Sequence, residues 1–371
     1  MINLAVFFGG ENCEHDISII TGLQFISKVN EYLYNIIPVY IDKKGDWFTG
    51  KDLKDIDNYP DDLGKLYKVG LVDNCNTLFY VKNKRLKKYI DIDVAVLCLH
   101  GINGEDGSIA SILEISKIPY VNSSILPSAV GMDKYIFNLV CKGLNINKID
   151  FFGVSKYEFD LNFDSVKNVV EEFGYPIIIK PSRQGSSIGI QVCKNSENLK
   201  NMLNQAFEYD NRLVIERYVD VKKEVNIACF WNKGELVFSK TEEPISKNEI
   251  LNFDDKYQTS SMDNMKRITP ARIDEIVEEE IKNISQKLYV NLNMFGIVRF
   301  DFIIDSNDNL YVNEVNTIPG SMANYLFDEY LYPELIEFMI TNAIIRFELN
   351  KKSKIDYDSG VLKNGFNGFK K

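Results

Sequence analysis

Hydrophobic runs alternate with amphipathic helical patterns through the first third of the chain. Strand-like runs occupy residues 4–8, 34–41 and 93–99, and apolar residues at helical spacing occupy 18–30 and 108–116. Strands that alternate with helices build parallel sheets. This part of the chain therefore predicts a parallel α/β sheet, and the more polar, hairpin-like residues 51–92 are interpreted as an elaboration of the same domain.

The rest of the chain predicts mixed helices and strands. Helical signals at 128–143 precede a strand pair at 153–159 and 175–180, and further strand-like runs follow at 213–219, 224–230 and 235–239. A polar stretch at 242–266 is long enough to be a lid, and a helix is expected at 271–291. We predict an N-terminal domain at 1–122, a central domain at 123–215, a C-terminal domain at 216–350 and a tail at 351–371.

Two runs rich in Val, Ile, Phe and Tyr, at 296–305 and 310–316, are joined by a polar turn and predict a β-hairpin. Alternation gives each strand two polar residues on one face: Arg299 and Asp301, then Glu314 and Asn316. Two carboxylates and an amide oxygen suit Mg²⁺, which completes its coordination with water and phosphate oxygens. A solvated acidic hairpin is the alternative. Arg299, which could hold a phosphoryl group beside the metal, favours the metal site.

Composition narrows the class of partner. The chain has 371 residues, enough for two or three domains, and its 45% hydrophobic and 26% charged residues are ordinary for a globular protein. The formal net charge is −10, and no block of Lys and Arg dominates a predicted face, which argues against nucleic-acid binding. We expect small-molecule partners.

Six scattered cysteines form no CxxC pair, so they are interpreted as reduced thiols of a cytoplasmic protein. The chain enters a strand at once, without the basic segment and apolar core of a signal peptide, and contains no run of about 18 apolar residues. Secretion and membrane insertion are therefore not expected.

Glycine-rich loops follow three of the predicted strands, at 9–18, 99–107 and 180–189. Glycine lets backbone N–H groups approach a ligand closely, and open α/β sheets bind ligands where strands lead into helices. The third loop lacks the GxxxxGK[ST] order of a Walker A loop, and a plain Gly-Ser turn is the alternative.

A series of ordered motifs resembles the D-alanine–D-alanine ligase family of the ATP-grasp superfamily, over roughly residues 1 to 350. Arg299-x-Asp301 followed by NEVNTIPG at 313–320 resembles its metal-binding hairpin. The segments GGENCEHDIS at 9–18, HGINGEDG at 100–107, SAVGMDK at 128–134 and the loop at 180–189 resemble other family motifs, as does NFDDKY at 252–257. The resemblance implies an ATP-grasp fold in which a parallel α/β domain precedes two α+β domains that sandwich ATP.

The resemblance also implies residue roles. Those that would contact ATP are Lys134, Lys180, Ser187, Glu216, Glu224 and Lys256. Glu14 would hold the ammonium of the first D-amino acid, His100 would lie beside its carboxylate, and Ser186 and Tyr257 would join Glu14 in closing the site. Arg299 and the backbone at Gly320 would stabilise an oxyanion. Asp301, Glu314 and Asn316 would hold Mg²⁺ or Mn²⁺, as two ions.

The segment after Gly320 departs from the family pattern NTxPGxTxxSxxP. The Ser that helps to hold the second substrate's carboxylate is replaced by Tyr325, and Ser321 or the Tyr325 hydroxyl could substitute for it. The implied reaction joins two molecules of D-alanine through an acyl phosphate, for peptidoglycan precursors. The alternatives are D-serine or another acceptor and, in a different class, a non-catalytic nucleotide-binding protein. Family members are commonly dimeric, so a homodimer is an open expectation.

Overall fold

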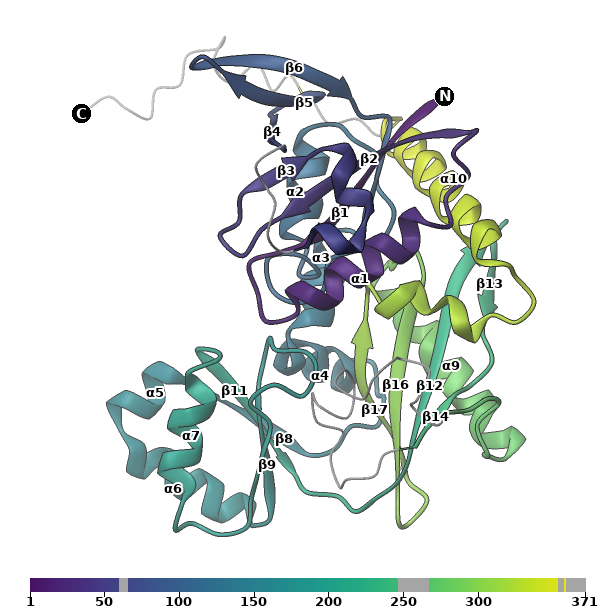
Figure 1. Ribbon diagram of the computed structural model, residues 1–371. Helices are drawn as coiled ribbons and strands as arrows, with labels where there is room; N and C mark the ends of the chain where they lie inside the picture. Colours follow the sequence, from purple (N-terminus) through teal and green to yellow (C-terminus); the bar gives the residue numbers. More distant parts are fainter. Residues whose placement is uncertain (60–65, 246–266, 353–356, 358–371) are drawn as a thin grey trace.

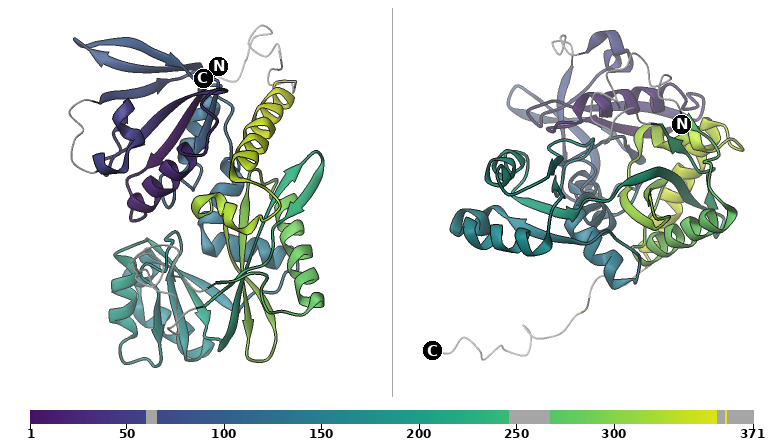
Figure 2. Two further views of the ribbon diagram at one scale, coloured as in Figure 1. Left: turned by 45° about the vertical axis from the view of Figure 1, so that its right-hand side comes forward. Right: turned by 90° about the horizontal axis from the view of Figure 1, so that it is seen from below.

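The computed structural model describes residues 1–59, 66–245, 267–352 and 357. Two residues with predicted roles, Lys256 and Tyr257, lie outside these ranges, as does most of the predicted lid. Three large sheets form the body of the protein, and Figures 1 and 2 show the first above the other two, which lie side by side.

The first sheet has the strand order β6-β5-β4-β3-β2-β1-β7. Its strands are β1 (Ile2–Gly9), β2 (Tyr34–Ile41), β3 (Trp47–Thr49), β4 (Tyr67–Val72), β5 (Cys75–Lys82), β6 (Arg85–Asp91) and β7 (Val94–Leu97). Strands β2, β1 and β7 run parallel to one another, whereas β3 pairs antiparallel with β2, and β4 to β6 continue the antiparallel pairing. The predicted parallel sheet is therefore correct for three strands, and the segment 51–92 supplies the predicted hairpin elaboration, preceded by the short 3-10 helices η1 (Lys51–Lys54) and η2 (Ile56–Asn58).

Helices cover this sheet from both ends of the chain. They are α1 (His15–Ile26), α2 (Ser108–Ile115) and the C-terminal α10 (Tyr332–Asn350). The β1 residues Leu4 to Phe8 are fully buried, and Leu335 and Met339 of α10 join the same hydrophobic cluster. The end of the chain thus returns to the N-terminal sheet, a contact that local patterning did not reveal.

The second sheet has the order β10-β9-β11-β8. Its strands are β8 (Phe151–Ser155), β9 (Ile177–Pro181), β10 (Gln191–Cys193) and β11 (Arg212–Arg217), with helices α5 (Lys156–Leu161), α6 (Phe163–Phe173) and α7 (Leu199–Phe207). Two predictions were wrong here. Residues 156–159 are helical, because Ser155 and Glu158 form a capping box that begins α5. The predicted strand pair is separated by β11.

The helical signals at 128–143 correspond to two helices, α3 (Ile125–Met132) and α4 (Lys134–Gly143). They meet at Asp133, whose side chain accepts hydrogen bonds from the first backbone N–H groups of α4. This cap turns the chain and fixes the N-terminal residue of α4, Lys134, at the break between the helices.

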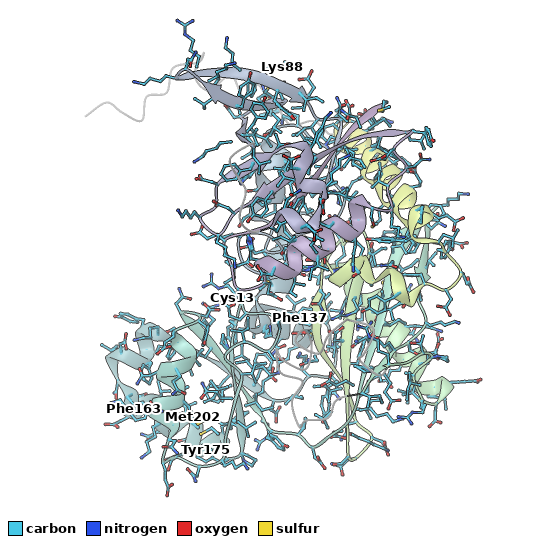
Figure 3. All side chains as sticks on the ribbon, in the orientation of Figure 1. Cys13, Lys88, Phe137, Phe163, Tyr175 and Met202 are labelled. Atoms are coloured by element: carbon cyan, nitrogen blue, oxygen red, sulfur yellow. The ribbon has the colours of Figure 1, made fainter. Side chains whose placement is uncertain are left out.

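The third sheet has the order β13-β12-β16-β17 and contains the predicted hairpin. Its strands are β12 (Val221–Asn232), β13 (Glu235–Phe238), β16 (Val298–Asp305) and β17 (Leu310–Asn316), covered by α9 (Glu275–Asn291). Ile281 and Leu288 of α9 pack on Phe300 and Phe302, in a cluster that includes Phe137 of α4 (Figure 3). A short pair, β14 (Glu243–Pro244) with β15 (Arg267–Ile268), flanks the sheet, and the 3-10 turn η5 (Gly320–Leu326) follows β17.

Candidate active site

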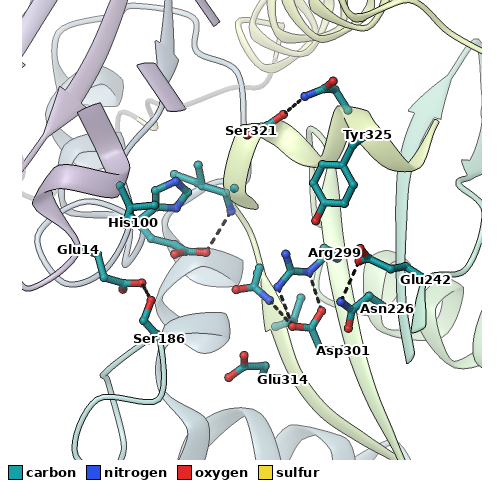
Figure 4. Close-up of a pocket in the computed structure, with 18 of the residues that line it drawn as sticks. Glu14, His100, Ser186, Asn226, Glu242, Arg299, Asp301, Glu314, Ser321 and Tyr325 are labelled. Carbon is teal, nitrogen blue, oxygen red and sulfur yellow. Dashed lines mark hydrogen bonds and ion pairs between the residues drawn. The ribbon is translucent and has the colours of Figure 1, made fainter. Parts of the chain in front are cut away.

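A cavity of about 470 Å³ lies where the first and third sheets meet the loop after β9. It collects most of the described residues that the sequence predicted: Glu14, His100, Lys134, Ser186, Glu224, Arg299, Asp301, Glu314, Asn316, Gly320 and Ser321. Those that Figure 4 labels come from segments far apart in the chain and surround one space. The tertiary fold therefore brings together residues that the sequence could relate only by their motifs.

The wall formed by β16 and β17 is charged and internally bonded. The register places Asp301 opposite Glu314 and Arg299 opposite Asn316. The Arg299 guanidinium donates two hydrogen bonds to the Asp301 carboxylate, at 2.7 and 2.8 Å, and Asn316 donates a third at 3.1 Å. Although burial alone would lower it, the pKa of Arg299 is raised because Asp301 lies against it. Arg299 therefore stays charged at the cavity wall.

The chemistry of Asp301, Glu314 and Asn316 fits a hard divalent cation such as Mg²⁺ or Mn²⁺, because all three offer oxygen ligands on neighbouring strands. Lys134 Nζ lies 3.5 Å from Glu314, so the carboxylate has positive charge beside it. Two carboxylates leave the remaining coordination to water and substrate oxygens. In the part of the chain that the structure describes, no group of three or more His, Cys, Asp or Glu side chains is placed to hold a metal ion.

On the opposite side of the cavity, Glu14 and Ser186 meet. The Ser186 hydroxyl donates to Glu14 Oε1 at 2.5 Å (Figure 4). The loop can approach this closely because residue 185 is glycine: a Cβ built there would lie 2.4 Å from Glu14 Oε2. Gly101, at φ +75°, allows a similar approach, with its Cβ position 3.0 Å from the same oxygen. Two glycine-rich loops thus enclose one carboxylate.

Behind this carboxylate lie two buried titratable groups, His100 and Glu105. His100 Nε2 hydrogen-bonds Thr21 Oγ1 at 2.9 Å, and burial lowers the pKa of His100 to about 4, so the imidazole is neutral at pH 7. Glu105 Oε1 accepts from the Ile318 backbone N–H at 3.1 Å. Burial, and then the neighbouring Glu14, raise the pKa of Glu105 to about 8. Glu105 therefore keeps its proton at pH 7 behind Glu14.

Two family models match the chain: "D-ala D-ala ligase N-terminus" over residues 3–123 and "D-ala D-ala ligase C-terminus" over residues 140–339. The chain belongs to the D-alanine–D-alanine ligase family. It is 36% identical over 370 residues to a D-alanine–D-alanine ligase of Thermosipho melanesiensis, covering 98% of this chain and 99% of that protein. The relative from Thermosipho africanus is 37% identical over 360 residues, 96% of each chain.

A solved structure of the Coxiella burnetii D-alanine–D-alanine ligase superposes with a TM-score of 0.80 at 22% identity, over 95% of this chain and 96% of that one. At that identity the likeness concerns the fold. The predicted fold class, ATP-grasp, is thereby confirmed for this ligase-family chain.

Three residues predicted to contact ATP, Lys180, Ser187 and Glu216, do not line the cavity in the described part of this ligase-family chain. Lys180 Nζ lies 2.6 Å from Glu216 Oε2, and both side chains are buried. Although burial would raise it, Lys180 and then Lys148 hold the pKa of Glu216 below its usual range. Lys148 also donates to the backbone of β17 at 2.7 and 2.8 Å. This buried ion-pair network links the second sheet to β17.

Sequence reasoning assigned no binding role to a polar group at the cavity wall that consists of Asn226, Glu242 and Arg267. Asn226 donates to Glu242 at 3.2 Å, and Arg267 Nε lies 3.2 Å from the same carboxylate. A signal existed for Asn226, since it follows Glu224 by two positions on one strand and shares its face. No local signal marked Glu242 or Arg267, which flank residues 246–266.

We predict that Gly185→Ala raises the KM for the first amino acid by about 10-fold or more, since displacing the Glu14 carboxylate removes a charged hydrogen-bond partner. The new methyl group would lie 2.4 Å from Glu14 Oε2 and force one of the two loops to move. Steady-state kinetics with ATP saturating test this. Gly143→Ala is the control, because its Cβ would meet nothing within 4 Å. Equal KM values for both variants would contradict the role of this close approach.

The raised pKa of Glu105 predicts a pH-dependent stability. In the unfolded chain this carboxyl ionises near pH 4.5, whereas the native protein keeps its proton until about pH 8. The native state therefore binds more protons between these values, and its stability falls as the pH rises through them. We expect Glu105→Gln to flatten the decline in melting temperature from pH 5 to 8. Glu235→Gln, at an exposed position, serves as the control. If the melting temperature of Glu105→Gln declines as steeply as that of the parent protein, the raised pKa of Glu105 does not cause the decline.

Proposed function

We propose that this chain is an ATP-dependent ligase that joins two molecules of D-alanine, through an acyl phosphate, for peptidoglycan precursors. The observation that carries the proposal is the meeting of two groups in one cavity. The Arg299–Asp301 pair with Glu314 and Asn316 suits a metal–nucleotide complex, and Glu14 with Ser186 suits a small amino acid. The family relatives named D-alanine–D-alanine ligase, aligned over almost the whole chain, support it.

In this proposal Glu14 binds the ammonium of the first D-alanine, because an anionic oxygen is the complement that an ammonium needs. The neutral imidazole of His100, held by Thr21, lies beside the carboxylate that is to be phosphorylated. Thr21 and the Ile318 backbone engage the ring, so the neutral imidazole packs beside the substrate without the cost of burying another charge. The donor is thereby oriented before chemistry begins.

For the nucleotide, Lys134 and Glu224 offer groups at the cavity wall, and Lys180, Ser187 and Glu216 lie behind it. We propose that Lys180 reaches phosphate once ATP competes with Glu216 for it. Lys256 and Tyr257, outside the described residues, keep their proposed roles at the γ-phosphate and in closing the site. When bound, divalent ions would neutralise phosphate charge, with Asp301, Glu314 and Asn316 as protein ligands.

The second D-alanine attacks the acyl phosphate through its amino group and releases phosphate. Arg299 would stabilise the oxyanion, since its charge is held in place by Asp301 and needs no reorganisation during the reaction. The backbone at Gly320 would add a hydrogen bond. Exclusion of water once the site has closed would favour attack by the amine over hydrolysis.

The six cysteines of the chain are free thiols in the structure, which supports the proposed cytoplasmic compartment. In the described residues, no helix is long and apolar enough to cross a membrane. We retain a homodimer, and the division into domains at 1–122, 123–215 and 216–350 with a tail at 351–371, as parts of the proposal.

The identity of the acceptor is the point at which a second candidate has its own support. The Ser321 hydroxyl is already bonded to Gln24, whereas Tyr325 points toward Arg299 across the cavity (Figure 4). Arg267 stacks on the Tyr325 ring, 4.5 Å from its centre. The group that replaces the family's Ser is therefore a large phenol held in a fixed position. A D-serine acceptor, whose hydroxyl could bond such a phenol, is the second candidate.

We expect Tyr325→Phe to raise the KM for the acceptor by about 10- to 100-fold, because a hydrogen bond to a charged carboxylate contributes roughly 1.5–3 kcal/mol. The KM for ATP should stay within twofold. Tyr330→Phe, at a ring packed against Phe230 outside the cavity, is the matched control. An unchanged acceptor KM in Tyr325→Phe would show that another group holds the carboxylate.

The proposed function is tested by phosphate release from Mg²⁺–ATP with D-alanine, alone and then with D-serine or D-lactate, with products identified by mass spectrometry. D-alanyl-D-alanine is the expected product. A preferred mixed product would support the second candidate. ATP binding without turnover on any acceptor would overturn the ligase proposal in favour of a nucleotide-binding protein.

A further inference from the structure

The hairpin formed by β5 and β6 extends beyond the rest of the first sheet, far from the cavity (Figures 1 and 2). Residues 81–89 are all exposed, although they form a regular two-stranded ribbon. A ribbon without burial on either face is marginally stable in water. The projecting hairpin therefore needs a binding partner to bury one of its faces.

The hairpin is the cationic extremity of an acidic protein. Residues 74–90 contain five cations, Lys82, Lys84, Arg85, Lys87 and Lys88, and no carboxylate, whereas the whole chain has a formal net charge of −10. Lys88, labelled in Figure 3, is paired with Asp91. The other four have no carboxylate within 4.0 Å among the described residues. At physiological salt, charges more than about 8 Å away are largely screened, so the body's negative charge does not cancel this local field.

Pairing of the strands sorts these side chains by face. Lys82 lies opposite Arg85, and Tyr80 opposite Lys87, so these four share one face. At the base of the hairpin the Tyr80 ring contacts those of Tyr67 and Tyr89, at centroid distances of 5.2 and 6.3 Å. The sequence had shown no block of Lys and Arg on a predicted face, because this face forms only when β6 folds back on β5.

The opposite face of the same hairpin is apolar at its tip. Val81 and Leu86 lie directly across from each other, and 64% and 62% of their side chains are exposed. Cations on one face, tyrosines at the base and aliphatic residues near the tip are the composition of segments that bind at the boundary of an anionic bilayer.

The turn at the tip carries a cation where its conformation favours glycine. The two turn residues, Asn83 and Lys84, have φ values of +53° and +59°, as in a type I′ turn. The β12–β13 hairpin makes the same kind of turn with Lys233 and Gly234, and so places glycine at the second position. Lys84 therefore places a positive charge at the tip in a strained backbone conformation. Such strain is typical of functional positions, so we infer that the charge takes part in binding.

We propose that the β5–β6 hairpin docks the protein reversibly on an anionic lipid surface. A convex ribbon exposed on both faces offers no groove for a nucleic-acid strand, and nucleic acid would give Val81 and Leu86 no apolar phase. Pairing of two β6 edges in a second copy would set cations against cations. A flat bilayer accepts the projecting tip and satisfies both its charge and its apolar residues.

The test is co-sedimentation of the full chain with vesicles of phosphatidylglycerol or of phosphatidylcholine, at physiological and at high salt. We expect binding to the anionic vesicles that salt abolishes. Each cation near the surface contributes about fivefold in partitioning, so the variant with Gln at positions 82, 84, 85 and 87 should partition more than about 100-fold less. A control with Gln at Lys194, Lys200, Lys233 and Lys287, all exposed and outside the hairpin, should bind as the parent does.

Lys84→Gly separates binding from folding, because it should raise the melting temperature and lower partitioning about fivefold. ATP turnover should be unchanged in every one of these variants, since the hairpin contributes nothing to the cavity lining. Four results would each overturn the proposal. The first two are equal binding to both lipids and an equal loss of vesicle binding in the control variant. The others are tighter binding to single-stranded DNA than to vesicles, and a change of oligomeric state in the Gln variant without loss of vesicle binding.

Discussion

Glu314→Ala lowers D-alanine-dependent ATP turnover by about 100-fold or more, if Glu314 holds the catalytic cation as proposed. The substitution removes one of two carboxylates, Asp301 and Glu314, that face each other across β16 and β17. The remaining carboxylate, Asp301, is already bonded to Arg299, so it cannot readily replace the ligand that is lost. Turnover measured across a range of Mg²⁺ concentrations should show half-activation displaced to much higher metal.

Two comparisons make this result specific. Glu280→Ala, an exposed glutamate on α9 outside the cavity, removes the same charge from the protein and should leave turnover unchanged. The melting temperature of Glu314→Ala should stay within a few degrees of the parent value. Glu314 is only partly buried, and the Lys134 side chain beside it is also partly exposed, so water can solvate its charge. If Glu314→Ala retains turnover close to that of the parent protein, Glu314 is not a ligand of the catalytic cation.

The β16–β17 hairpin, which contains Glu314, could be predicted from the sequence because its signals are local. Alternation of Val, Ile and Phe with polar residues defines both strands, and the four-residue turn sets them antiparallel. The side-chain faces of Arg299, Asp301, Glu314 and Asn316 follow from that period. The bulge after Asp301 did not follow, because nothing in the sequence marks where the β16–β17 register shifts.

Contacts over long sequence separations explain what the sequence could not predict. The return of α10 to the first sheet, and the bond between Glu105 and the Ile318 backbone, join segments more than 200 residues apart. The ion pair of Lys180 with Glu216 depends on β11 lying beside β9, which local patterning placed differently. Family motifs named many of the cavity residues, but only the fold shows that Glu216 is engaged by a lysine.

Arg299→Lys should lower kcat by about 100- to 1,000-fold while the KM for ATP changes little, because the lost interaction belongs to the transition state. Lysine keeps the charge but lacks the planar fork that donates two hydrogen bonds to Asp301 at 2.7 and 2.8 Å. Its ammonium would therefore be free to turn away from the position where the oxyanion develops. The loss should appear in dipeptide formation under saturating substrates.

The matched control is Arg272→Lys. Arg272 makes the same two-pronged contact with Glu243, at 2.6 and 3.1 Å, but lies outside the cavity lining. A lysine there disrupts an equivalent ion pair, so any general effect of losing one should be equal in both variants. If kcat falls only for Arg299→Lys, with melting temperatures alike, the effect belongs to the reaction. Two outcomes would contradict the role of Arg299: an equal loss of activity in both variants, or a parent-like kcat in Arg299→Lys. In either case Arg299 is a structural partner of Asp301, and other donors, such as the backbone at Gly320, must stabilise the oxyanion.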